Sequence, residues 1–254
     1  MFSASQQGML DRVLAAVARD ARVDALLGTG SLVTGGWDAQ SDFDFVVVEA
    51  APLADRRAFA EAIGPLLSSF TGEHVGEPRL LICLYGPPLL HVDYKFVPRA
   101  EPAKLSERPK VLWARDAAAT EAWLSTARIG QTPRQPQWFE DRVWLWLHYG
   151  VTKWARGEYF EAISTLDFLR SMVFGPMMQR QAGRPMRGQR RLEALAGARE
   201  KLLPTLAGYD AAEIRQAFVE AVAVYVDLRE ADPPPRPVPQ MPQALLDLLR
   251  SPKP

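Results

Sequence analysis

The first half of the chain alternates between helix-like and strand-like hydrophobic patterns. Residues 5–19 place apolar side chains at helical spacing, which predicts an opening amphipathic helix, and residues 53–67 return to helical character. Between them, a short and mostly apolar segment at 23–27 leads into a Gly-Thr-Gly-Ser stretch. Runs rich in β-branched and aromatic residues predict strands at 43–48, 80–85, 89–97 and 111–113. These elements together predict a mixed α/β domain.

The pattern changes near residue 130, where Gly130, Pro133 and Pro136 mark the best candidate for a domain boundary. Residues 232–243 are rich in proline and predict an extended or poorly ordered segment. Helical periodicity predicts helices at 138–156, 158–180, 188–202, 210–230 and 244–249. The predicted fold class is therefore α+β. A domain at 1–130, with a mixed sheet flanked by helices, precedes an α-helical bundle at 131–254 that includes a proline-rich tail.

Composition narrows the classes of partner. The 254 residues include 30 basic and 30 acidic side chains, and this balance makes a nucleic-acid partner unlikely, because proteins that grip a phosphate backbone usually carry a basic excess. The single cysteine, Cys83, lies in an apolar run and is expected to fill core space. The N-terminus lacks the pattern of a signal peptide, and no apolar run is long enough to span a bilayer. We expect a cytoplasmic protein with no membrane partner.

The most informative chemistry lies at the start of the strand predicted at 43–48. Asp42 and Asp44 share one face of this strand because successive side chains alternate, while Phe43 and Phe45 point to the other face. Two carboxylates so close together repel each other unless a cation lies between them. Mg²⁺ favours oxygen ligands and commonly uses one or two carboxylates plus substrate phosphates. Asp42 and Asp44 are therefore candidate metal ligands.

Gly30 and Ser31 lie upstream, where a strand gives way to a turn or helix. Glycine lets the backbone approach a ligand closely, and exposed N–H groups with a serine hydroxyl can hold phosphate oxygens. This pair alone is weak, but it gains weight from the Asp-x-Asp that follows ten residues later.

The pattern of Gly-Ser, ten residues, Asp-x-Asp and an apolar strand resembles the signature of the DNA polymerase β-type nucleotidyltransferase superfamily. The resemblance implies that Gly30 and Ser31 contact a triphosphate and that Asp42 and Asp44 bind metal. It also implies a third carboxylate on a later strand. Asp93 fits this role, because it is the one acid in the strand pair at 80–97, and alternation places it opposite a core-facing set of Val92, Tyr94 and Phe96.

Metal-assisted, in-line nucleotidyl transfer is the mechanism that this resemblance implies. The co-substrate would be ATP or another nucleoside triphosphate, with Mg²⁺ as cofactor or Mn²⁺ in its place. Asp42, Asp44 and Asp93 would be the catalytic residues. For Asp93 the roles of metal ligand, general base or both stay open.

The second half of the chain resembles the C-terminal domains of aminoglycoside and lincosamide nucleotidyltransferases, most clearly at 148–162. This resemblance implies a small hydroxyl-bearing acceptor. No drug-contacting residue is matched, so an antibiotic is one candidate acceptor and does not follow from the resemblance; a homodimer is compatible with it. Arg142, Trp146, Tyr149 and Lys153 fall along one stripe of the predicted helix. Lys153 is thus a candidate contact to the triphosphate, and the alternative is a lysine at a helix end that reaches solvent.

Two other functions stay open. Minimal nucleotidyltransferase antitoxins share the Gly-Ser and Asp-x-Asp spacing, and they modify a partner protein marked by Arg, four to six residues and His. Arg142 and His148 match that pattern in letters, but on one helix they would point about 120° apart. The third possibility is a catalytically silent nucleotide-binding module, which the presence of all three carboxylates disfavours.

Overall fold

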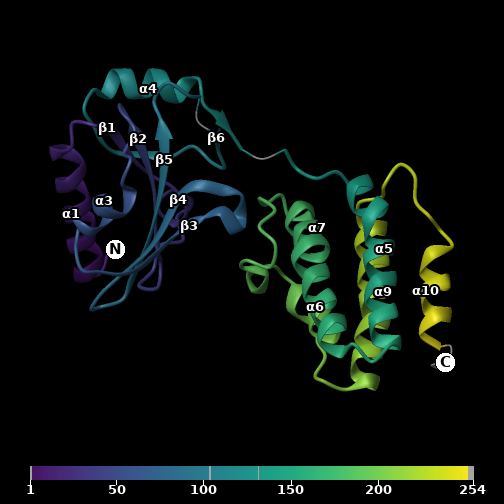
Figure 1. The fold of residues 1–254 in the computed structure, drawn as a ribbon. Coiled ribbons are helices and arrows are strands. Elements are labelled where there is room, and N and C mark those ends of the chain that lie inside the picture. The colour runs from purple at the N-terminus through teal and green to yellow at the C-terminus, as the bar shows by residue number, and fades with distance from the viewer. Residues whose placement is uncertain (1, 103, 131, 251–254) are drawn as a thin grey trace. The chain divides into compact units, whose positions relative to one another are not determined.

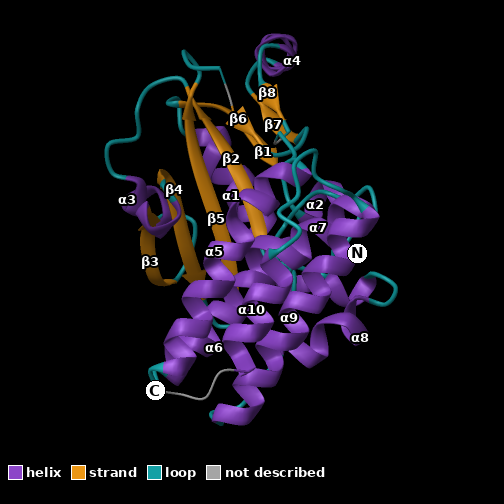
Figure 2. Ribbon diagram, turned by 90° about the vertical axis from the view of Figure 1, so that its right-hand side faces the viewer, coloured by secondary structure: helices purple, strands orange, loops and turns teal. Residues whose placement is uncertain are grey.

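The computed structural model describes residues 2–102, 104–130 and 132–250. The chain divides into two compact units, Met1–Gln131 and Thr132–Pro254. Figure 1 shows the elements of both units in chain order, and Figure 2 shows that the strands gather in the first unit, while the second is helical. This arrangement confirms the predicted α+β class. The last four residues of the predicted tail lie outside the described residues.

The first unit is built on a six-stranded mixed sheet with the order β3-β4-β5-β2-β1-β7. Within this sheet β2 and β5 run parallel, and the other described neighbours pair antiparallel. A separate parallel pair joins β6 (Lys104–Leu105) to β8 (Arg128–Ile129). The strands of the larger sheet are β1 (Val23–Gly28), β2 (Phe43–Glu49), β3 (Leu66–Gly72), β4 (Glu77–Tyr85), β5 (Leu90–Pro98) and β7 (Lys110–Ala114).

Helices cover both faces of this sheet. On one face α1 and α3 enclose an apolar core with the odd-numbered aromatic residues of β2, and on the other α4 packs Trp123 and Leu124 against Val46 and Val48. Short polar side chains cap the N-terminal ends of these helices. At the start of α1, for example, Ser3 forms a capping box with Gln6. The helical segments are α1 (Ala4–Arg19), α2 (Ser31–Thr34), α3 (Arg56–Glu61), η1 (Glu73–Val75) and α4 (Ala117–Ser125).

The predicted helix at 53–67 is wrong over most of its length. The helix α3 covers only Arg56–Glu61, and residues Leu66–Gly72 form β3 instead. Gly64 and Pro65 separate the two elements, because proline disfavours helical backbone at the preceding residue. As an end strand of the sheet, β3 has only Gly72 buried, which explains why its apolar pattern is weak.

Cys83 is buried in the core on the α1 side of the sheet, as predicted. Burial raises the pKa of its thiol to about 12, so the thiolate is scarce at neutral pH. The side chain therefore acts as apolar filler and not as a nucleophile.

The second unit is a helical bundle with one large apolar core. The predicted helix at 158–180 forms as α6, a π-helical stretch η2 and α7, with Pro176 just after the π-helical turn. The prediction at 188–202 is wrong, because this region holds only short helical turns. The elements are α5 (Pro136–Ala155), α6 (Tyr159–Leu169), η2 (Arg170–Phe174), α7 (Gly175–Gln181), η3 (Leu192–Ala194), α8 (Ala198–Leu202), η4 (Leu203–Thr205), α9 (Ala211–Ala231) and α10 (Met241–Arg250). None of the described helices has the length and apolar character needed to cross a membrane.

A buried carboxylate, Glu140, ties the proline-rich segment to this bundle. Its Oε1 accepts hydrogen bonds from Trp144 Nε1 at 2.9 Å and from the backbone N–H of Val238 at 2.7 Å. Its Oε2 accepts from the hydroxyl of Tyr225, and Arg229 lies 3.4 Å from Oε1. These contacts join α5, α9 and the segment that leads to α10. The segment is therefore fixed to the bundle at Val238, and residues 241–243, which were predicted to be extended or poorly ordered, begin α10 instead.

We expect Glu140→Gln to lower the free energy of unfolding by about 1–3 kcal/mol, because the amide nitrogen of glutamine cannot accept a hydrogen bond and at least one of the donors around Glu140 loses its acceptor. The matched control is Asp141→Asn, since Asp141 is exposed and accepts a hydrogen bond from the side chain of Gln137. That substitution should change stability by less than about 0.5 kcal/mol. Urea denaturation of both variants measures the difference, and equal midpoints would show that the Glu140 contacts add nothing.

Candidate functional site

The turn after β1 has a backbone conformation that requires glycine. Gly30 has φ +61° and ψ −134°, a combination that L residues avoid. The turn is fixed to the start of β2, because the backbone N–H of Thr29 donates to the carbonyl of Asp44 at 2.9 Å. The Gly-Ser pair and the second aspartate of the Asp-x-Asp pair are thus held together by main-chain contact.

Gly30 also lies directly against the Asp44 carboxylate. A Cβ atom built on Gly30 would lie 1.9 Å from Asp44 Oδ2, far inside van der Waals contact. The absence of a side chain at position 30 therefore makes room for this carboxylate. The Gly30 backbone and the Asp44 carboxylate therefore lie in direct contact at this site.

Ser31 places a hydroxyl at the same turn without a protein partner. The residue is 6% exposed, and its Oγ makes no hydrogen bond to any of the described residues. A buried hydroxyl left in this state costs about 1–3 kcal/mol, and native proteins seldom keep one without a role. An added ligand with an acceptor oxygen would satisfy it.

Asp44 and Asp93 lie side by side on neighbouring strands. They are register partners in the parallel β2–β5 pair, whose strands are about 4.8 Å apart by general sheet geometry. The predicted alternation is confirmed, because Val92 and Tyr94 are fully buried on the opposite face. Asp42 lies two residues before Asp44, just outside the strand.

His91 links these carboxylates. Its Nε2 lies 2.8 Å from Asp93 Oδ1, and its Nδ1 lies 3.9 Å from Asp42 Oδ2. The hydrogen bond to Asp93 raises the pKa of the His91 imidazole, burial opposes the rise, and the charges of Asp93, Asp42 and Asp44 add to it. Because all three carboxylates act on one imidazole, they form a single electrostatic cluster.

The donor chemistry of this cluster suits a metal that shares its ligands with a substrate. Across the described residues, no three carboxylate, histidine or cysteine side chains converge as a ready metal cage. Mg²⁺ usually takes one or two carboxylates and completes its shell with water and phosphate oxygens. Asp42, Asp44 and Asp93 offer carboxylate oxygens of this kind, next to the orphaned Ser31 hydroxyl.

A fourth carboxylate, Glu107, reaches the same turn and was not predicted. The backbone N–H of Gly30 donates to Glu107 Oε1 at 2.7 Å. The register explains this contact, because Lys110 pairs with Gly28 in the antiparallel β1–β7 pair, and the chain before Lys110 therefore continues toward Gly30. Only the strand order could have revealed this residue, and a single sequence does not give that order.

Lys153 belongs to the second unit. Its Nζ donates to Glu158 Oε2 at 2.8 Å and lies 5.2 Å from the centre of the Tyr149 ring. The hydrogen bond to Glu158 raises the pKa of Lys153. The proposed contact between Lys153 and a triphosphate stays a prediction.

Arg142 and His148 both lie on α5, which is continuous from Pro136 to Ala155. Six helical steps point their side chains about 120° apart. Arg142 instead stacks on Trp138, with 4.4 Å between the guanidinium carbon and the ring centre. The two residues therefore do not converge on one phosphate.

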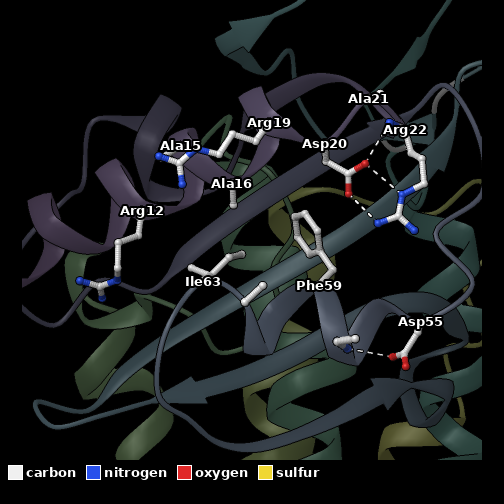
Figure 3. Close-up of a pocket in the computed structure, with 12 residues that line it drawn as sticks. Arg12, Ala15, Ala16, Arg19, Asp20, Ala21, Arg22, Asp55, Phe59 and Ile63 are labelled. Atoms are coloured by element: carbon white, nitrogen blue, oxygen red, sulfur yellow. Dashed lines mark hydrogen bonds and ion pairs between the residues drawn. The ribbon is translucent and has the colours of Figure 1, made fainter.

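A cavity of about 650 Å³ lies between α1 and α3, on the sheet face opposite the carboxylates. Figure 3 shows its lining, in which Arg12 and Arg19 extend along α1 while Arg22 pairs with Asp20. None of the predicted site residues lines it. The cavity is thus separate from the carboxylate cluster.

Comparisons with known proteins give structural likeness only. No family model matches the chain, and no curated protein matches it. An aminoglycoside 6-adenyltransferase from Bacillus subtilis is 14% identical, with 96% of this chain and 97% of that chain covered and a TM-score of 0.41. A nucleotidyltransferase-like protein from Exiguobacterium sibiricum is 10% identical, with 89% and 76% covered and a TM-score of 0.40. Likeness at this level does not assign a family, so a function must be argued from the site itself.

Proposed function

We propose that this protein is a metal-dependent nucleotidyltransferase. It would move a nucleoside monophosphate, AMP foremost, from a nucleoside triphosphate to a hydroxyl group of a small molecule and release pyrophosphate. One observation carries the proposal: the Gly30 turn lies against the Asp44 carboxylate, and the Ser31 hydroxyl in the same turn has no hydrogen-bond partner among the described residues. Such a site combines phosphate donors with metal ligands, as the resemblance noted above implies.

Asp42, Asp44 and Asp93 would hold the metal. When bound, Mg²⁺ would neutralise charge on the phosphate oxygens and lower the barrier to displacement. The residues of the turn would orient the triphosphate, since backbone N–H groups and the Ser31 hydroxyl donate to phosphate oxygens. ATP and Mg²⁺ follow from the resemblance and from the oxygen-rich donor set.

The transfer forms one bond and breaks one. The acceptor oxygen bonds to the α-phosphorus, the bond from that phosphorus to the bridging oxygen breaks, and pyrophosphate leaves with the electron pair. The hydroxyl proton passes to a base within hydrogen-bond reach. Asp93 is the candidate base, with His91 holding Oδ1 of its carboxylate, and it is also a candidate metal ligand.

The first experiment is calorimetric titration with the α,β-methylene analogues of ATP, GTP, CTP and UTP in the presence of Mg²⁺. We expect the wild-type protein to bind at least one analogue, and we expect Asp42→Asn/Asp44→Asn to lose that binding because the metal ligands lose their charge. Removal of Mg²⁺ with a chelator should have the same effect on the wild type.

The matched control is Asp38→Asn, which removes one acid from the same loop. Asp38 is exposed and caps a local turn by accepting from Gln40 N–H and Ser41 Oγ. Its replacement should leave the dissociation constant within about twofold of wild type. If the wild-type protein binds none of the four analogues, the proposed function is wrong. Binding that supports the proposal would justify a screen of hydroxylated acceptors, antibiotics among them.

A further inference from the structure

The carboxylate of Glu107 occupies the backbone donor that a phosphate group would use. Gly30 N–H donates to Glu107 Oε1 at 2.7 Å, which is a short, charge-assisted hydrogen bond. Glu107 comes from the connection between β6 and β7, far from Gly30 in sequence. The contact is therefore tertiary, and it forms between two separate loops.

Two features of the turn support an anion at this position. The backbone N–H of Gly30 already donates to the carboxylate of Glu107. Beside it, the buried Ser31 hydroxyl has no hydrogen-bond partner among the described residues. Glu107 thus satisfies one donor of the turn, while a second donor stays unsatisfied.

The negative charge of Glu107 at the Gly30 turn opposes the binding of a triphosphate there. Glu107 adds a negative charge to a turn that already contacts Asp44, whose register partner is Asp93. A triphosphate and the Glu107 carboxylate cannot accept from the same N–H with good geometry, and they repel each other at short range. Binding of the one requires the other to leave.

We propose that Glu107 is an internal competitor of the triphosphate for the Gly30 amide and so sets the nucleotide affinity of the site. The inference rests on the proposed function. The free protein holds the turn in its anion-binding shape with its own carboxylate, and the nucleotide displaces it. The measured affinity is the affinity of the open site multiplied by the fraction of molecules in which Glu107 is displaced.

The test is the dissociation constant of α,β-methylene-ATP with Mg²⁺, measured by calorimetry for wild type and Glu107→Gln. Glutamine keeps an oxygen that can accept from Gly30, so the turn should stay folded, but it removes the charge. We expect the variant to bind about tenfold more tightly, which corresponds to a competitor that blocks about nine sites in ten. Glu107→Ala serves as a second variant, in which the side chain at position 107 no longer accepts a hydrogen bond from the backbone N–H of Gly30.

Glu121→Gln is the matched control. Glu121 is exposed and pairs with Arg108, the neighbour of Glu107, so its replacement removes the same charge and a loop contact without touching Gly30. Its dissociation constant should equal that of wild type. Thermal unfolding of each variant distinguishes competition from a structural role of Glu107. If Glu107 mainly supports the turn, Glu107→Gln should have a lower melting temperature and bind the analogue more weakly.

If wild type binds and Glu107→Gln binds equally or more weakly, the competition is refuted and the proposed function stands. If neither protein binds any triphosphate analogue, the proposed function is refuted and the competition with it. Tighter binding by Glu107→Gln but not by Glu121→Gln supports the proposal.

Discussion

An Asp44→Asn protein is expected to stay folded and to lose nucleotidyl transfer by about 10³-fold or more. Asparagine has nearly the shape of aspartate, so the space beneath Gly30 stays filled, and the main-chain bond from Thr29 to the carbonyl of residue 44 is unchanged. The loss follows because a neutral amide is a poor ligand for Mg²⁺. The measurement is pyrophosphate release with an acceptor that the wild-type protein uses.

Asp93→Asn in the same assay separates the two roles open to Asp93. If Asp93 is the general base, the variant should keep Mg²⁺-dependent analogue binding and lose the acid limb of the pH–rate profile. If it is mainly a metal ligand, the Mg²⁺ concentration needed for half-maximal binding should rise.

A wild-type rate in Asp44→Asn would contradict the assignment of the carboxylate cluster as the catalytic site.

Gly30→Ala is expected to abolish triphosphate binding, with a loss of at least about 100-fold. The added Cβ would meet Asp44 Oδ2 at 1.9 Å, so either the turn or the carboxylate must move. The positive φ adds strain of about 1–3 kcal/mol for a residue with a side chain. Calorimetry with α,β-methylene-ATP measures the loss, and thermal unfolding measures the strain.

Gly35→Ala is the matched control for this substitution. Gly35 also has a positive φ, +76°, but a Cβ there would meet no atom within 4 Å. Gly35 is in the left-handed helical region (ψ 12°), so the control should show the cost of a side chain at positive φ in the same loop without the clash, and it should bind the analogue nearly as well as wild type. Equal losses in both variants would mean that strain, and not contact with Asp44, explains the requirement for glycine.

The faces of the site strands could be predicted from sequence, but their pairing could not. Strict alternation around Asp44 and Asp93 indicated which side chains are buried, and the structure confirms this at Val92 and Tyr94. That β2 and β5 are neighbours with Asp44 opposite Asp93 depends on long-range pairing. The resemblance to a known superfamily gave that neighbourhood as an expectation.

Segments with weak patterns were the ones predicted wrongly. Exposure of β3 on the outer edge of the sheet removes the apolar alternation that marks a strand, so no strand was predicted there and the helix predicted at 53–67 was extended into its first two residues. The helix α4 was missed because its sequence, rich in alanine, has little amphipathic contrast. In the second unit, residues 188–202 form short turns around Gly197, whose φ of +73° interrupts a helix.

Glu107 was missed for a different reason. No local property of Ser106-Glu107-Arg108 distinguishes it from an ordinary polar loop. Its position at Gly30 results from the register of β7 against β1, which depends on packing across the whole sheet. Residues of this kind are found from structure and not from spacing.

The parallel pairing of β2 with β5 has a consequence for how the protein acquires its site. Parallel neighbours cannot be joined by a hairpin, so α3, β3 and β4 all lie in the crossover between them. Closing such a long loop is entropically costly and slow. Asp44 and Asp93 therefore come together only after the crossover has folded, and a nascent chain that ends before β5 lacks this pair of carboxylates. Nucleotide binding would accordingly report the completion of folding in the first unit.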